Sequence, residues 1–149
     1  MKHISQAARK VIDKLVENLS EPGDAKTFDA HNYTEKWNGG IMAVHVENIG
    51  NIPSNGTGNL YSITHYYKQN GDMMRDPEMI FWCGQTINQK CEIVDTYYPV
   101  YFRQDNAGIA DESVSFENGA CIGYRRAMQA DHAKFANLWM KNIKEQQRL

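Results

Sequence analysis

Five short segments with strand-like composition follow one another between two amphipathic helices. The segments cover residues 41–49, 60–68, 79–84, 91–103 and, more weakly, 108–116. Each connection between them is shorter than the dozen or so residues that a crossover between parallel strands needs. The order of elements therefore predicts an α+β fold, with a single antiparallel sheet of about four to five strands packed against the N- and C-terminal helices.

Both flanking helices carry one apolar stripe. Apolar residues recur at helical spacing from Ile4 to Leu19, and Pro22-Gly23 is expected to end the first helix. The last helix is predicted over residues 126–147, and its apolar stripe is expected to contain Phe135, Leu138, Trp139 and Ile143. Because each helix has a single apolar side, we expect both to pack on one face of the sheet.

Two segments predict less regular structure. Residues 24–40 are polar with scattered aromatic residues, and Phe28, Tyr33 and Trp37 are expected to anchor an ordered loop there. Pro99 lies inside the segment 91–103. Since proline cannot donate a hydrogen bond to a strand ladder, it indicates an edge position or a bulge.

The size and charge of the chain indicate one globular domain over residues 1–149. Hydrophobic residues make up 42% of the 149 positions, and 16 basic residues stand against 18 acidic ones. No apolar stretch reaches the roughly 18 residues of a membrane helix, and no secretory signal is recognisable, so we expect a cytoplasmic protein with no membrane contact. The charge is uneven, since residues 70–117 are acidic and residues 125–149 are basic. Blocks of this size favour the solvated faces of ordinary elements, and a polarised surface that steers a charged partner is the alternative.

The three cysteines, Cys83, Cys91 and Cys121, do not suggest a disulfide framework or a metal site. Their number is odd and no C-x-x-C is present. We expect buried thiols that act as small hydrophobic side chains. Cys83 and Cys91 flank the sequence GQTINQK, which is expected to form a hairpin loop.

The polar stretch QNGDMMRDPEM at residues 69–79 is the most distinctive sequence between the predicted strands. Asn70-Gly71 is a strong turn signal, and the proline that follows Asp76 restricts it to an extended or turn conformation. Asp72 and Asp76 can each accept from nearby backbone amides, and Arg75 can pair with either carboxylate. These residues predict a structured connection of about eight residues between two strands.

A catalytic interpretation of the same stretch uses its carboxylates. Asp72, Asp76 and Glu78 could bind a divalent cation in a hydrolase or nuclease, and Asp95 or His65 could join them. The spacing is not that of a calcium loop, and the sequence predicts no metal site. His45 and His65 lie on neighbouring segments, where cross-strand packing is favoured over a two-histidine metal site.

Other chemistries find no support in the sequence. There is no nucleophile elbow, phosphate-binding loop or dinucleotide fingerprint, so no catalytic residue and no cofactor is predicted. Nucleic-acid binding is a weaker hypothesis. It has strand tyrosines to stack on bases, at positions 66, 67, 97, 98 and 101, but the net charge of -2 lacks the electrostatic footprint of such a protein.

Four stretches occur in a fixed order: GGIMAVHVENIG, ITHYYKQNGDMMRDPEMIFW, YYPVYFRQDNAGI and FANLWMKNIKEQ. In these motifs the chain resembles a family of small domains of unknown function carried by bacteria, plasmids and phages. The resemblance covers about residues 41–147 and implies an accessory gene of a mobile element, without an established activity. The matching positions are His65, Tyr66, Gln69, Asn70, Gly71, Asp72, Asp76, Pro77, Glu78, Phe81, Tyr98, Pro99, Arg103, Asp105, Gly108 and Trp139.

The leading hypothesis is therefore a non-enzymatic accessory protein of mobile-element or phage origin that binds a protein of the host or of the element. One form of it is interference with a host defence or replication complex, through an acidic surface that imitates nucleic-acid charge. A structural homodimer joined through a tyrosine-rich sheet face is a further hypothesis. The predicted binding residues are His65, Tyr67, Asn70, Asp72, Arg75, Asp76, Glu78, Tyr98, Arg103 and Asp105.

Overall fold

An antiparallel sheet that follows the order of the chain forms the centre of the molecule. The computed structural model describes residues 1–29 and 42–149, in which the sheet has six strands in the order β1-β2-β3-β4-β5-β6 and β7 pairs with β8. The elements are α1 (Gln6–Leu15), β1 (Ala25–Phe28), β2 (Val44–Asn51), β3 (Asn59–Gln69), β4 (Asp72–Ile87), β5 (Ile93–Gln104), η2 (Asp105–Ala107), β6 (Ile109–Glu112), β7 (Val114–Glu117), β8 (Ala120–Tyr124) and α2 (Arg126–Gln146). The predicted α+β class with an antiparallel sheet is confirmed.

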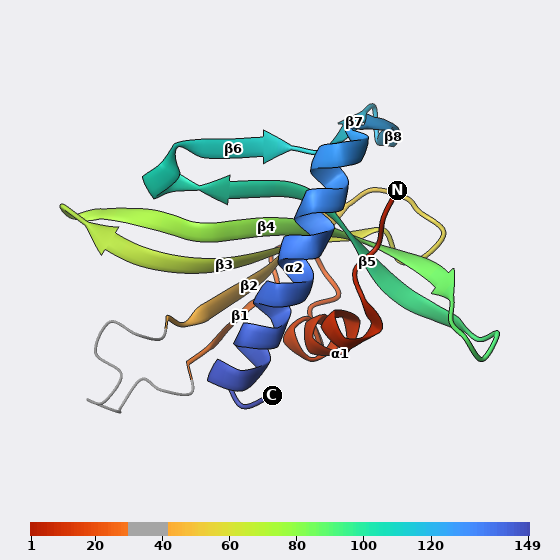
Figure 1. Ribbon diagram of the computed structural model, residues 1–149, viewed down its shortest axis with the longest axis horizontal. Coiled ribbons are helices and arrows are strands. Elements are labelled where there is room, and N and C mark those ends of the chain that lie inside the picture. Colours follow the sequence, from red (N-terminus) through yellow and green to blue (C-terminus); the bar gives the residue numbers. More distant parts are fainter. Residues whose placement is uncertain (30–41) are drawn as a thin grey trace.

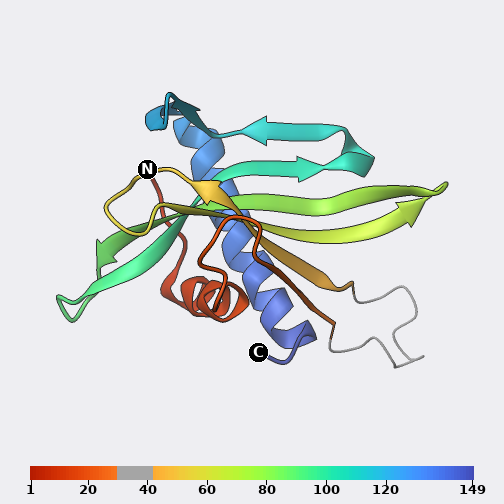
Figure 2. The same cartoon turned by 180° about the vertical axis from the view of Figure 1, so that it is seen from behind.

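Both helices pack on one face of this sheet, which we call the helix face. α2 runs obliquely across it, and α1 lies beside the C-terminal half of α2 (Figures 1 and 2). The hairpins β3–β4 and β5–β6 extend past α2 on one side (Figure 1). None of the described helices is long and apolar enough to cross a membrane.

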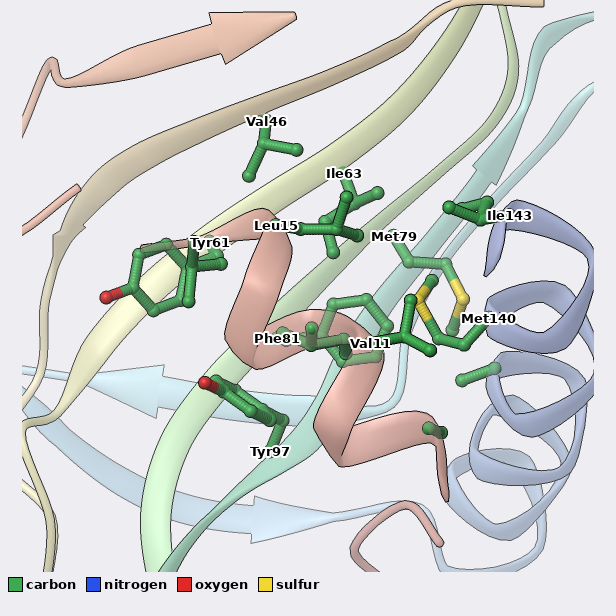
Figure 3. Packing of buried hydrophobic residues seen from close by; sticks show 14 of the residues in the cluster. Val11, Leu15, Val46, Tyr61, Ile63, Met79, Phe81, Tyr97, Met140 and Ile143 are labelled. Atoms are coloured by element: carbon green, nitrogen blue, oxygen red, sulfur yellow. The ribbon is translucent and has the colours of Figure 1, made fainter. Parts of the chain in front are cut away.

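The main core lies between the helices and the helix face. Val46, Ile63 and Phe81 come from three adjacent strands, and each is almost fully buried. Leu15 of α1 and Met140 of α2 close over them from the other layer (Figure 3). Burial of each large side chain of this kind contributes about 1.5–3 kcal/mol. The alternating apolar residues of the strands therefore explain why the helices dock on this face.

A smaller core occupies part of the opposite face, which we call the outer face. Trp82, Val100 and Val114 are buried there, with Phe116 packed against them. The indole of Trp82 lies edge-on to Phe116, with ring centroids 5.1 Å apart, and its Nε1 donates to Ile52 O at 2.7 Å. The β7–β8 hairpin and the loop after β2 thus cover one end of the outer face, and none of the described elements covers the end near the β3–β4 turn, which we call its open end (Figure 2).

The sheet has more strands than the sequence predicted. β1 forms within the segment expected to be a loop and includes Phe28, whereas Tyr33 and Trp37 lie outside the described residues. The weak segment 108–116 is divided into β6 and β7 at Ser113, whose N–H donates to Val100 O. β8 was not anticipated, although Asn118 and Gly119 have the positive φ angles of 52° and 75° that suit a tight hairpin turn.

The expected connection at residues 70–78 is wrong, because most of it belongs to β4. Asn70 and Gly71, with φ angles of 53° and 86°, form a two-residue turn by themselves, and β4 begins at Asp72. Arg75 pairs with Tyr66 and Glu78 with Thr64, so Asp76 and Pro77 together face His65 in a bulge. The bulge breaks the simple alternation that would have identified this stretch as a strand.

The loop expected between Cys83 and Cys91 is also shorter, because β4 continues to Ile87. Only Cys83 is buried. Cys91 and Cys121 are exposed, since they lie in the turn after β4 and on the short strand β8, so the prediction of three buried thiols is wrong. The bulge expected at Pro99 is confirmed by the register shift between Ile80 and Phe81, which pair with Tyr101 and Pro99.

The buried stripe of α2 differs from the predicted one. Trp139 and Ile143 are buried, but Phe135 and Leu138 are 37% and 59% exposed. In the N-terminal half of α2, the buried side includes the polar residues Gln129 and His132. Gln129 Nε2 donates to Lys2 O at 2.6 Å, and this satisfied amide occupies a position that a search for apolar residues passes over.

Candidate functional site

Four of the predicted binding residues come together at the open end of the outer face. Arg75, Glu78, Arg103 and Asp105 form what we call the arginine–carboxylate cluster. Arg103 Nε donates to Asp105 Oδ1 at 2.7 Å, and the backbone N–H of Arg75 donates to Asp105 Oδ2 at 2.8 Å. Arg75 Nε lies 3.5 Å from Glu78 Oε1, an ion-pair distance without hydrogen-bond geometry. The pairing of β3, β4 and β5 brings these side chains together.

The charges of this cluster are engaged within the molecule. The side chains of Glu78 and Asp105 are each only 14% exposed. Glu78 Oε2 accepts from the buried hydroxyl of Ser62 at 2.7 Å, and Thr64 Oγ1 lies 3.5 Å from the same oxygen. The Arg75 N–H and then the Arg103 guanidinium hold the pKa of Asp105 below its ordinary value, and Asp105 in turn raises the pKa of Arg103. These contacts fasten β4 to β3 and to the chain after β5.

The other predicted binding residues lie elsewhere. Asp76 turns to the helix face, where its Oδ1 accepts from Gln104 Nε2 at 2.8 Å. His65 is also buried on that face, 5.4 Å from Trp139 between ring centroids, and burial lowers the pKa of its imidazole. Asn70 and Asp72 are exposed at the β3–β4 turn, and Tyr67 is half-buried. Tyr98 lies near Trp82, with 6.5 Å between the ring centroids. The ten residues therefore do not form one site.

The carboxylates proposed as metal ligands occupy different environments. Glu78 is on the outer face, Asp76 is on the helix face, and Asp72 is exposed next to the hairpin turn. Asp95 is exposed on β5 opposite Gln85. Within residues 1–29 and 42–149, no three histidine, cysteine, aspartate or glutamate side chains are grouped so that they could hold a metal ion. His45 and His65 also lie on opposite faces, because His45 pairs with Thr64 rather than with His65.

One serine–histidine pair occurs that sequence reading missed. Ser113 Oγ lies 3.0 Å from His132 Nδ1, between the start of β7 and the N-terminal half of α2. Ser113 is only 1% exposed and its hydroxyl also lies 3.5 Å from Pro99 O. A hydroxyl in that position cannot reach a substrate, so the pair anchors α2 to the sheet.

A groove with a volume of about 770 Å³ lies between α1 and α2. We call it the lysine groove. Its apolar lining comes from Ala7, Ala8, Val11 and Leu149. Its charged lining comes from Lys10 and Lys14 on α1 and from Lys141 and Lys144 on α2. All four lysines are exposed, so each of the two helices contributes a pair of cationic side chains to the groove.

Helical spacing brings the lysines of each helix to the side that faces the groove, and their positive charge exceeds the negative charge of the lining. Residues four apart on α1 and three apart on α2 lie on one side of their helix. Lys14 and Lys144 lie in the last turns, where cations stabilise the helix dipole, but Lys10 and Lys141 have no such role. Asp13 is the one acidic side chain in the described lining, and its Oδ1 accepts from Tyr97 Oη at 2.7 Å, so four lysines stand against one carboxylate side chain. The predicted basic character of residues 125–149 was the sequence signal for this groove.

Comparison with known proteins places the chain in a family. It belongs to the family described as domain of unknown function (DUF6908), whose model matches residues 10–149. No curated protein and no solved structure matches the chain. The expected membership of a family of small domains of unknown function is thereby confirmed, whereas an origin in bacteria, plasmids or phages stays a prediction.

Proposed function

We propose that the protein is a non-enzymatic binding module, and that its lysine groove receives an acidic, amphipathic helix of a partner protein. The observation that carries this proposal is the combination of an apolar floor with cationic residues on both sides. An amphipathic helix binds in such a groove through apolar residues at positions i, i+3, i+4 and i+7. The groove supplies the complementary surface for that stripe.

The arrangement of the lysines favours an acidic helix over a ligand with a single charged head. Lys10 and Lys14 stand on one wall, and Lys141 and Lys144 stand on the other. A helix with glutamates or aspartates flanking its apolar stripe places carboxylates opposite both walls. Such complementary charges accelerate association and fix the orientation of the partner more than they raise the affinity.

The arginine–carboxylate cluster is less suited to this function. Its carboxylates accept hydrogen bonds from Ser62, Arg75 and Arg103, so a partner would have to break interactions that the fold already makes. The cluster itself cannot supply an acidic surface that imitates nucleic acid, because the side chains of Glu78 and Asp105 are mostly covered. The exposed carboxylates of this region, such as Asp72 and Asp95, lie apart from the cluster. We therefore assign the contact with a partner to the lysines of α1 and α2, rather than to the acidic residues 70–117 on which the sequence hypothesis relied.

The partner remains a protein of the host or of a mobile element, and interference with a host complex is one way in which such a module acts. The resemblance of the sequence motifs to mobile-element genes supports this part of the proposal. No group of described residues is arranged for metal-dependent hydrolysis, and the proposal assigns no catalytic step to the protein.

A synthetic peptide tests the chemistry of the groove. The probe is an amphipathic peptide of about 18 residues, with leucines along one stripe and glutamates on both flanks. Fluorescence anisotropy would measure its affinity at roughly 50 mM and roughly 500 mM salt, because screening weakens exposed charge pairs. We expect binding at least about tenfold tighter than that of a scrambled peptide of the same composition, and weaker binding at high salt.

Matched double variants locate the binding. Lys10→Ala with Lys141→Ala should weaken peptide binding by about tenfold. Lys2→Ala with Lys90→Ala removes the same charge from exposed lysines outside the groove, and it should leave the affinity within about twofold. Equal losses in the two variants, or equal binding of the scrambled peptide, would show only general attraction of acidic chains. Capture by anionic lipid vesicles in place of the peptide would assign the lysines to a membrane surface.

A further inference from the structure

A second hollow lies beside the N-terminal half of α2, between that helix and strands β5 and β6. It has a volume of about 460 Å³. Its lining includes Phe102 and Asp111 from the strands and Asp131, His132 and Phe135 from the helix. We call it the aromatic–acidic pocket. It is separate from the lysine groove, with which it shares no lining residue.

Three rings form the aromatic side of this pocket. Phe102 and Phe135 meet edge to face, with centroids 5.2 Å apart and planes at 76°. His132 lies against Phe102 at 5.6 Å, and its Nδ1 is fixed by the hydroxyl of Ser113. Phe135 is 37% exposed, so one ring of this group stays accessible at the mouth. Accessible aromatic faces attract cations through the quadrupole of the ring.

Two carboxylates complete the lining. Asp111 and Asp131 enter the pocket from opposite walls, and none of the ion pairs within the described residues involves either of them. No lysine or arginine lines the pocket. Burial lowers the pKa of His132, although Asp111 and Asp131 act in the opposite direction, so the imidazole supplies little positive charge at neutral pH. The pocket thus offers negative charge and aromatic surface without a cation of its own.

From this combination we infer that the pocket binds an organic cation, an alkylammonium group such as a methylated amine. The positive nitrogen lies between the two carboxylates, and its alkyl groups contact Phe102 and Phe135. A bare divalent metal does not suit this lining, because hard cations take six or more oxygen ligands and much of the surface here is apolar. The volume is within the range of pockets that hold small ligands.

Choline and its neutral isostere, 3,3-dimethylbutan-1-ol, test the inference directly. They have nearly the same shape, and only choline carries a charge. Two-dimensional NMR of the full chain would follow the resonances of Phe135, His132 and Asp111 during each titration. We expect saturable shifts with choline at an affinity at least about tenfold higher than that of the isostere. Equal affinities would overturn the inference, because they would show apolar contact alone.

Variants separate the carboxylates from the rings. Asp111→Asn with Asp131→Asn should weaken choline binding at least about tenfold and leave binding of the isostere unchanged. Asp72→Asn with Asp95→Asn neutralises two exposed carboxylates elsewhere and serves as the control. Phe135→Leu is the second test, and it serves alone if the first double variant fails to fold. It keeps an apolar side chain at a partly exposed position but removes a ring, so it should weaken choline binding. An equal loss in the control would contradict the assignment.

A peptide containing trimethyllysine distinguishes a protein side chain from a free amine as the source of the cation. If it binds more tightly than choline, the natural ligand is a modified protein. If choline binds more tightly, the ligand is a small molecule. Failure of both, with the acidic amphipathic peptide still bound in the lysine groove, would overturn this inference and leave the proposed function intact.

Discussion

The arginine–carboxylate cluster lies on the sheet and the lysine groove lies between the helices. The charged side chains of the cluster are paired with one another, whereas those of the groove are exposed to solvent. In the cluster, Asp105 accepts from Arg103 and from the Arg75 backbone, and Glu78 accepts from Ser62. In the groove, four exposed lysines stand beside an apolar floor, and Asp13 is the one acidic side chain among the described residues that line it. Charge that is already paired stabilises the fold, whereas charge left to solvent is available to a partner.

This difference has a cause in the elements that carry the residues. The cluster lies on three paired strands, where the ladder fixes neighbouring side chains at short distances. The lysines lie on two separate helices, whose long side chains remain hydrated beside a hollow. Substitutions in the cluster should change the free energy of unfolding, whereas substitutions in the groove should change the affinity for a partner.

The largest effect on stability is expected from Glu78→Ala. The substitution leaves the hydroxyls of Ser62 and Thr64, which are 7% and 1% exposed, without their carboxylate acceptor. We expect a loss of about 1–3 kcal/mol in the free energy of unfolding, measured by urea denaturation. Glu78→Gln keeps one acceptor oxygen and should lose less. A loss below about 0.5 kcal/mol would mean that the cluster does not fasten the strands.

Charge reversal in the groove should change partner preference. Lys10→Glu with Lys141→Glu is expected to weaken binding of the glutamate-flanked peptide by more than about tenfold, or about 1.4 kcal/mol. The same variant should gain affinity for a lysine-flanked peptide of the same pattern. Arg75→Ala provides the comparison, because its effect on either affinity should stay within about twofold. Anisotropy titrations would measure both, and an unchanged preference would contradict the assignment of the groove.

The pH dependence of Asp105 gives a smaller, signed effect. The pKa of Asp105 in the fold is below its ordinary value of 3.8, so its ionised form stabilises the fold above about pH 4. This contribution is lost as the pH falls through the lower pKa of the folded state. The stability difference between the wild type and Asp105→Asn should therefore be constant near neutral pH and shrink in acid. Urea denaturation between about pH 7 and about pH 2.5 would measure it, and a constant difference would be the contrary result.

The smallest effect is expected for the stability of the groove variant. Lys10→Ala with Lys141→Ala removes exposed side chains that make no ion pair within the described residues. The free energy of unfolding should change by less than about 0.5 kcal/mol. Thermal and urea denaturation would both show this. A large loss would mean that the lysines hold the helices together, and the contrast with the cluster would disappear.

Much of the sheet could be predicted from the sequence, but the continuity of β4 could not. Alternation identified the strand around Val46, and β-branched and aromatic composition identified the strand around Ile63. The bulge at Asp76 and Pro77 interrupts that alternation, so the stretch from Asp72 was interpreted as a connection. Long-range pairing with β3 and β5, rather than local propensity, keeps these residues in a strand.

The candidate site was predicted only in part. An ion pair of Arg75 was predicted, but with Asp72 or Asp76, and this choice of partners is wrong because the structure pairs Arg75 with Glu78 and Asp105. The lysine groove depends on how α1 packs beside α2, which the apolar stripes alone do not determine. The apolar stripe of α2 also fails to predict which side of the helix is buried. Gln129 and His132 are buried, whereas Phe135 and Leu138 lie on a more exposed side of the helix. Polar residues with internal partners shift the buried side of a helix away from its most apolar side.

The most direct test of the central claim is to map where the glutamate-flanked peptide binds. Two-dimensional NMR of the isotope-labelled protein would report both regions in one titration. The account predicts saturable shifts at Ala7, Val11 and Leu149 in the lysine groove, with no comparable shifts at Ser62, Arg75 and Arg103. Shifts concentrated at the arginine–carboxylate cluster, with the groove unchanged, would contradict it.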